Sequence, residues 1–296
     1  MIGWFPSLYP DELLSSVCAR YAEKLRYPAR TSAISDLFGD RCSRVAYDVP
    51  GQLNRLVSQL PSHSGLTLEE MLYRHTLFPF YVSTRTPQQT RHLIAALGDS
   101  PVTVVYRSVG MVTYREHCPK CLRFCTECVK EDVSLYGEPY WHRLHQVPGL
   151  LLCTKHECQL VDSKVKAQGA SLVSAKTMID TMNLRRTPRC NNGHLLGFAS
   201  DIRRIVEENA SIPLSGLRFQ YRTELQSLQL IQSGRLVTDK VIQAIMDFYS
   251  SSLIQQLSFS TYSADMRKFL NRVLDGPSYH PLDHLLMMRF LHIPLP

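Results

Sequence analysis

Apolar positions recur with helical spacing through the first hundred residues. From Leu13 to Leu25 they repeat every three or four residues, which predicts an amphipathic helix with Asp11 as its N-cap. Four further helices are predicted: Thr31 (N-cap) to Phe38 before Gly39, Leu53 to Leu60, a helix opened by a Thr67 and Glu70 capping box, and Thr86-Pro87 to Gly98. Such short helices fit a helix-turn-helix, which places one helix in the DNA major groove, and fit a plain helical bundle equally well.

The hydrophobic pattern changes after residue 101 and becomes helical again beyond about residue 200. A β-branched run over 102–106 and an apolar run over 149–152 predict two short strands. An apolar stripe from Thr238 through Leu257 predicts one continuous core-facing helix. The final apolar segment, 281–291, predicts a buried helix.

The composition excludes several classes of protein. With 44% hydrophobic and 20% charged residues among 296, the chain is typical of a globular protein and not of a disordered or collagen-like one. No apolar run approaches the roughly 18 residues that a membrane span needs. Residues 1–11 lack the basic and apolar regions of a signal peptide. We therefore expect a cytoplasmic protein with no membrane partner.

Cysteines are concentrated in one short stretch. Six of the nine fall between residues 118 and 158. Because thiols stay reduced in the cytoplasm, such clustering indicates metal ligation and not disulfide formation. Cys18 and Cys42 stand in helical surroundings and are best interpreted as small core residues.

Two close pairs of soft ligands stand out within this stretch. Cys125-x2-Cys128 is followed, after 24 residues, by Cys153-x2-His156. Tetrahedral zinc takes four such ligands, and two facing turns would supply them. Four protein ligands leave no open position for a catalytic water, so this pattern predicts a structural zinc site.

A second zinc ion is predicted from the remaining ligands. Cys118-x2-Cys121 would pair with Cys190 and His194 of the Cys-Asn-Asn-Gly-His segment, and Cys158 could replace one of them. The sequence therefore predicts two zinc ions in all. An iron–sulfur cluster on the first four cysteines is disfavoured, because their spacing differs from the bacterial ferredoxin pattern.

The net charge of +7 favours a polyanionic partner. Five arginines around the Cys190 segment form a candidate DNA-binding patch, although solvated surface explains any single one equally well: Arg185, Arg186, Arg189, Arg203 and Arg204. The run Tyr140-Trp141-His142-Arg143 mixes aromatic and basic side chains, as nucleic-acid surfaces do. A Trp in this position more often packs beside the metal.

Motifs of catalysis are missing from the sequence. There is neither a His-Glu-x-x-His motif nor a Gly-x4-Gly-Lys-Ser/Thr phosphate loop. A metal-dependent nuclease or hydrolase is disfavoured for want of an open metal site. We expect a protein that is not an enzyme.

The block from Leu122 to His156 closely resembles the zinc motif of the TniQ/TnsD family, which selects target sites for bacterial transposons, including CRISPR-associated ones. The opening Trp4 to Ser15, the stretch Arg74 to Tyr81 and the late His280 to Leu291 segment are also similar to the family. The family's zinc ligands correspond to Cys125, Cys128, Cys153 and His156.

The resemblance implies a targeting adaptor that binds double-stranded DNA and recruits the AAA+ ATPase TnsC, acting at the bacterial nucleoid. An alternative is a protein-binding adaptor that links an RNA-guided Cascade complex, with its guide RNA, to TnsC without reading DNA sequence. Sequence-specific members commonly have a longer carboxy-terminal region with further DNA-binding helices.

Together these observations predict a mainly α fold with a small zinc-ribbon-like β portion. We expect an N-terminal helical domain of helix-turn-helix type over residues 1–110. A zinc-binding domain of the TniQ type would cover 111–200. A C-terminal helical domain would cover 201–296.

Overall fold

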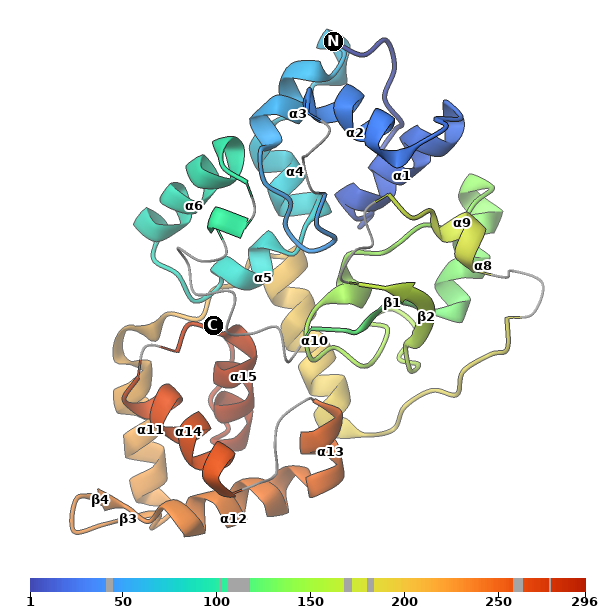
Figure 1. Ribbon diagram of the computed structural model, residues 1–296. Helices are drawn as coiled ribbons and strands as arrows, with labels where there is room; N and C mark the ends of the chain where they lie inside the picture. The colour runs from blue at the N-terminus through green and yellow to red at the C-terminus, as the bar shows by residue number, and fades with distance from the viewer. Residues whose placement is uncertain are drawn as a thin grey trace.

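The computed structural model describes residues 1–40, 45–101, 103–105, 118–167, 172–179, 184–257, 263–276 and 278–296. Figure 1 shows the N-terminal helices at the top, a small sheet at the right and the C-terminal helices at the lower left. The fold is mainly helical, as predicted, with little β structure. Within the described ranges, no helix is both long enough and apolar enough to cross a membrane.

The N-terminal elements confirm all five predicted helices and add a short one, α5. They are α1 (Leu14–Lys24), α2 (Arg30–Phe38), α3 (Leu53–Gln59), η1 (Ser62–Ser64), α4 (Leu68–His75), α5 (Phe78–Val82) and α6 (Pro87–Asp99). The Thr67 hydroxyl accepts from the Glu70 amide, and Thr86 forms a reciprocal capping box with Gln89. Gly39 ends α2 with a φ of 67°.

Two of the predicted N-caps are wrong. Leu13 stands at the N-cap of α1, without a side-chain cap, and Ala29 does so for α2 in place of Thr31. The Asp11 carboxylate instead accepts from Arg143 Nε and from the Leu144 amide, both at 3.0 Å. The guanidinium of Arg143 is buried and far from Asp11 in the sequence. Its charge-assisted hydrogen bond to the Asp11 carboxylate is stronger than a bond from the backbone amides at the start of α1 would be.

The central segment holds β1 (Cys121–Phe124), α8 (Thr126–Tyr136), η3 (Leu144–Gln146), β2 (Val161–Lys166) and α9 (Ala175–Met178). β1 pairs antiparallel with β2, with Arg123 opposite Asp162 and Phe124 opposite Val161. The sequence signal for β2 is weak, because Ser163 takes one of the three inward-facing positions and only Val161 and Val165 are apolar there.

Neither predicted strand forms. Of the run 102–106, the structure describes 103–105, which is helical, with Val104 and Val105 donating to the Pro101 carbonyl. In 149–152, only Leu152 makes an isolated bridge, to Gln159. Gly149 turns the chain with a φ of 76°, so the apolar run packs as an irregular segment.

The C-terminal region is helical, apart from a small hairpin. Its elements are α10 (Gly193–Glu207), α11 (Leu214–Ser227), β3 (Ile231–Gln232), β4 (Arg235–Leu236), α12 (Thr238–Tyr249), α13 (Ser251–Gln256), α14 (Ser263–Leu274) and α15 (Pro281–Phe290). The helix predicted to run from Thr238 through Leu257 is broken at Ser250, where φ is 67° and the hydroxyl caps α13. α15 is buried along almost its whole length, as predicted.

A large hydrophobic cluster joins all three regions of the chain. It includes Leu13 and Phe80 from the N-terminal helices, Trp141 from the central segment, and Ile202 and Leu286 from α10 and α15. α10 also contacts α5 directly. The predicted boundary at 110 lies outside the described residues, and the one at 200 falls inside α10. The proposed domain limits therefore stay predictions.

A buried ion-pair network connects α1 to the central segment. The Arg20 guanidinium lies 2.8 Å from Glu12 and 3.1 Å from Glu138, and all three side chains are almost fully buried. The same guanidinium stacks 3.7 Å from the centre of the Tyr9 ring. Glu138 lies just after α8, the helix that begins at Cys125. The network therefore holds α1 against the segment that follows α8.

Removing the buried guanidinium should destabilise the protein strongly. Arg20→Leu leaves Glu12 and Glu138 buried without their cation, which we expect to lower the free energy of unfolding by about 3 to 5 kcal/mol. Urea denaturation monitored by circular dichroism measures this loss. Lys24→Ala is the control, because Lys24 approaches the same Glu138 from an exposed position, at 3.9 Å. That change should cost less than about 1 kcal/mol. Equal costs for the two variants would contradict the assigned role of Arg20.

Candidate metal centre

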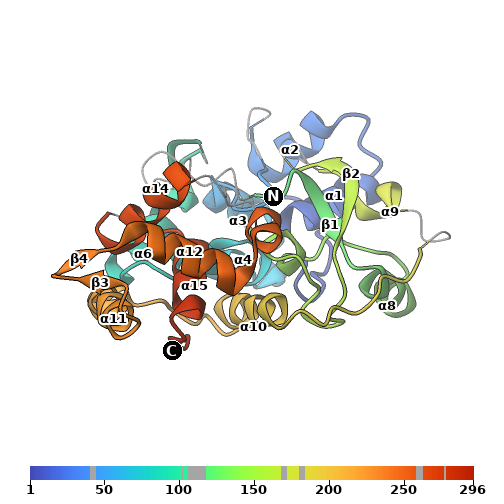
Figure 2. The same cartoon turned by 90° about the horizontal axis from the view of Figure 1, so that it is seen from below.

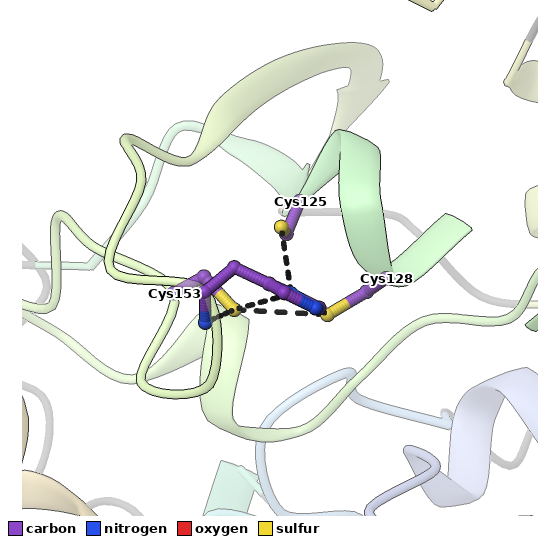
Figure 3. A group of neighbouring side chains, drawn as sticks. Cys125, Cys128 and Cys153 are labelled. Atoms are coloured by element: carbon purple, nitrogen blue, oxygen red, sulfur yellow. Dashed lines mark hydrogen bonds between the residues drawn. The ribbon is translucent and has the colours of Figure 1, made fainter. Parts of the chain in front are cut away.

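Four soft ligands converge between the start of α8 and a tight turn after η3. Cys125 is the N-cap of α8 and Cys128 lies in its first turn, while Cys153 and His156 come from the turn. Figure 3 shows the three thiols facing a common centre. All four ligand atoms lie within 4.8 Å of one another, and the three cysteines are buried.

The separations fit a tetrahedral metal ion. His156 Nδ1 lies 3.5, 3.4 and 3.6 Å from the sulfurs of Cys125, Cys128 and Cys153, and the last two sulfurs are 3.6 Å apart. Bonds of about 2.3 Å to sulfur and 2.0 Å to nitrogen place tetrahedral ligand atoms about 3.5 to 3.8 Å apart. The cluster can therefore hold one metal ion, with all four positions taken by the protein.

The turns that carry the ligands are held by buried hydrogen bonds. Arg123 donates through its guanidinium to the Leu150 and Val147 carbonyls, the latter at 2.9 Å, and so fixes the segment that leads to Cys153. The Gln146 amide group bonds both the N–H and the carbonyl of Arg123. Burial lowers the pKa of Arg123 to about 10, which leaves the side chain charged at neutral pH.

Three further side chains contact the ligands, and the spacing of the motif did not identify them in these roles. Glu131 accepts from His156 Nε2 at 3.1 Å, an arrangement that orients the imidazole for Nδ1 ligation. His145 Nε2 lies 3.8 Å from the Cys128 sulfur. The sequence suggests Cys158 as a substitute ligand of the second zinc site. In the structure its sulfur lies 3.4 Å from that of Cys125. Glu131 lies one helical turn after Cys128, which is the signal that could have revealed it.

The pKa values of two histidines beside the cluster are shifted in opposite directions. Burial lowers the pKa of His145 to about 3, so this ring is neutral at physiological pH. His142 is half-buried, and its hydrogen bond to Asp132, 2.9 Å long, outweighs the desolvation and raises its pKa. The two rings lie 4.8 Å apart.

The run Tyr140-Trp141-His142-Arg143 is a packing element and not a nucleic-acid surface. Trp141 is buried in the main core and donates from Nε1 to the Val173 carbonyl at 2.7 Å. Tyr140 donates to the Pro10 carbonyl, and Arg143 pairs with Asp11. The aromatic and basic side chains of this run therefore make their contacts within the chain.

The residues of the predicted second zinc site lie in different surroundings. Cys118 lies beside Tyr81, and Cys121 pairs with Lys166 across the small sheet. The Cys190 amide donates to the Glu157 carbonyl, while the His194 ring packs 4.6 Å from that of Phe248. Among the described residues, only the first cluster meets the geometry of a metal site. The second zinc ion stays a prediction.

The five arginines of the candidate DNA patch divide into two groups. Three of them, Arg185, Arg186 and Arg189, are exposed on the extended segment that precedes α10. Arg203 and Arg204 lie on α10 and pair with Glu207 and Glu208 at 4.0 and 3.8 Å. Arg204 also donates to the Leu295 and Pro296 carbonyls.

Comparison with known proteins now adds to this geometry. A TniQ family model matches residues 4–160, more than half of the chain. The chain belongs to the TniQ family. The matched range contains all four residues of the metal cluster. The chain is also 22% identical over 257 residues to the Transposon Tn7 transposition protein TnsD of Escherichia coli, a match covering 86% of this chain. The match spans about half of the TnsD length, 50%.

Replacing one thiolate of this TniQ cluster should remove one metal ion. We expect Cys125→Ser to lower the metal content measured by elemental analysis by one ion per chain and to lower the unfolding temperature, because structural metal binding contributes folding free energy. Cys121→Ser, at a half-buried position in β1, is the control and should keep this ion. A Cys125→Ser protein with its full metal content would contradict the assignment. The metal content of Cys190→Ser tests the second site separately. Loss of one ion per chain from this variant, relative to the parent protein, would establish the second site.

Glu131 should set the affinity of the site without belonging to it. Glu131→Gln removes the carboxylate that accepts from His156, and we expect about 10- to 100-fold weaker metal binding. Competition with a chromogenic chelator measures the affinity. Glu127→Gln is the matched control on α8, because Glu127 pairs with Lys130 at the surface. If both variants bind metal equally well, the carboxylate does not orient His156.

Proposed function

We propose that this chain is a target-selecting component of a bacterial transposon, acting as an adaptor and not as an enzyme. The observation that carries the proposal is the TniQ match over residues 4–160, which encloses the metal cluster. The likeness to the transposition protein TnsD, extending over 86% of the chain, supports the same role. The assignment applies to the part of TnsD that this chain matches.

We propose zinc as the ion in the Cys125, Cys128, Cys153 and His156 cluster. Three thiolates and one imidazole are the donors that zinc prefers, and a redox-inactive ion with four protein ligands suits a structural role. When bound, zinc would hold the N-terminus of α8 against the 153–156 turn. This would stabilise the chain segments on either side of the turn, including α8 and β2.

Double-stranded DNA is the proposed nucleic-acid partner. Three exposed arginines lie on one extended segment, Arg185, Arg186 and Arg189, and no ion pair joins them to another described residue. They can therefore reach phosphates without first breaking an ion pair. Arg203 and Arg204 are weaker candidates, because they already pair with glutamates on α10. The segment is extended and exposed, so it can follow a phosphate backbone.

The proposed protein partners are the AAA+ ATPase TnsC and, in the alternative adaptor role, a Cascade complex with its guide RNA. Membership of the TniQ family and the likeness to TnsD support these candidates. Co-expression with each candidate, followed by co-purification, separates the two roles. Retention of Cascade proteins and guide RNA without any DNA affinity of the isolated chain would favour the adaptor role.

Exchange of the three exposed arginines should weaken DNA binding in a salt-dependent manner. For a short duplex, we expect Arg185→Gln, Arg186→Gln and Arg189→Gln together to reduce the slope of log K against log salt by about 2 to 3, because each phosphate that an arginine neutralises adds roughly 0.9 to that slope. Fluorescence anisotropy across a salt series measures this slope. Arg91→Gln, Arg235→Gln and Lys240→Gln form the charge-matched control, because these exposed residues lie on other elements. An identical slope in both triple variants would show that the segment does not bind DNA.

A further inference from the structure

Residues 184–190 form an extended segment that leads toward α10, and we call it the arginine segment. Its exposed cations are Arg185, Arg186 and Arg189. Figure 2 shows it running from the right of the view to the start of α10. None of its residues belongs to a helix or a named strand, so no regular secondary structure fixes its course. Such a segment keeps one conformation only through contacts with other parts of the fold.

Main-chain contacts join the arginine segment to the turn that carries two of the candidate metal ligands. The Cys190 amide donates to the Glu157 carbonyl at 2.8 Å, and Arg189 forms an antiparallel bridge with Cys158. Glu157 directly follows the ligand His156 in the sequence. The end of the arginine segment is therefore attached to the metal-bearing turn.

The metal-bearing turn is closed by hydrogen bonds of its own. The Cys153 amide donates to the Cys158 carbonyl, and the Glu157 amide donates to the Cys153 carbonyl, both at 2.8 Å. Glu157 has a φ of 54°, a left-handed conformation that costs free energy for a residue other than glycine. The Cys158 sulfur is buried 3.4 Å from that of Cys125. A metal ion bound by Cys125 and Cys153 would offset the cost of this conformation and keep the Glu157 carbonyl in place.

Other contacts orient the arginine segment without ordering all of it. The Thr187 hydroxyl oxygen is buried, whereas Arg186 and Pro188 on either side are exposed. Just after the segment, the Asn192 side chain caps the start of α10. The segment is thus held between the metal-bearing turn and α10, with its arginines on the exposed side.

Order in the arginine segment before binding would increase its affinity for a phosphate backbone. Fixing a mobile backbone costs conformational entropy, and a segment that becomes ordered only on binding has its affinity reduced by that cost. Arg189 gains most from order in advance, because its own backbone forms the bridge to Cys158. The attachment to the turn is therefore the contact on which the binding strength of the segment depends.

We propose that the metal-bearing turn positions the arginine segment for DNA through the hydrogen bond between Glu157 and Cys190, so that loss of either the metal or this bond weakens DNA binding. The proposal rests on the DNA contact proposed above. With zinc held at the cluster, the main chain of residues 157–158 carries the effect to Arg189. No contact between DNA and the metal ligands is required.

Two substitutions at one position test the hydrogen bond. Cys190→Pro removes the amide hydrogen that bonds Glu157, and Cys190→Ala keeps it. Both variants lack the thiol, so any metal ligation by Cys190 is lost equally from the two. With a short duplex at one fixed salt concentration, we expect Cys190→Pro to bind about fivefold more weakly than Cys190→Ala, as for the loss of one hydrogen bond. Fluorescence anisotropy measures both affinities, and equal values would overturn the proposal.

Trypsin cleavage tests the attachment without DNA. The rates after Arg185 and Arg186 are compared with the rate after Arg235, an exposed residue of β4 that serves as the internal reference. Relative to this reference, both Cys190→Pro and removal of the metal by a chelator should accelerate cleavage of the arginine segment about fivefold or more. An unchanged ratio in either case would refute the attachment. Equal acceleration at all three sites would do so too, because it would show general unfolding.

Failure of the DNA contact and failure of the positioning role give different results. If exchange of the three arginines leaves the salt slope unchanged, the DNA contact is wrong and the positioning role fails with it, whatever the cleavage ratio shows. If the arginines are needed for the slope but Cys190→Pro behaves like Cys190→Ala, the DNA contact stands and the positioning role alone is wrong.

Discussion

The structure depends on one geometric constraint, the meeting of four ligand atoms within bonding distance of a common centre. Cys125 and Cys128 come from the start of α8, and Cys153 and His156 come from a turn that follows after 24 intervening residues. Fixing both ends also fixes the segment between them. That segment carries Glu138 and Arg143, which pair with Arg20 and Asp11, so the order imposed at the cluster extends to the N-terminal helices.

With four protein ligands around it, a metal ion in this cluster would have no open position for a substrate or a catalytic water. The thiols are buried, and every tetrahedral position is filled by the protein. A metal ion held here would fix the start of α8 against the turn that carries Cys153 and His156.

Local patterns predicted the helices better than the strands. Thr67 and Thr86 set helix starts through hydrogen bonds to residues three positions on, which a sequence displays directly. Strand pairing is non-local, and β2 forms because Val161 lies opposite Phe124 across the sheet. The break at Ser250 was likewise missed, because an apolar stripe continues on both sides of it and only packing against other elements fixes the bend.

The sequence by itself determined the mainly helical class and the ligand set of Cys125, Cys128, Cys153 and His156, because ligand type and close spacing are local properties. The tertiary structure decided which groups surround that set. Glu131 was brought to His156, the Cys158 sulfur was placed against Cys125, and the residues of the second predicted site were placed in different surroundings. It also separated the exposed arginines from those paired on α10, since burial and ion pairing depend on contacts between residues far apart in the chain.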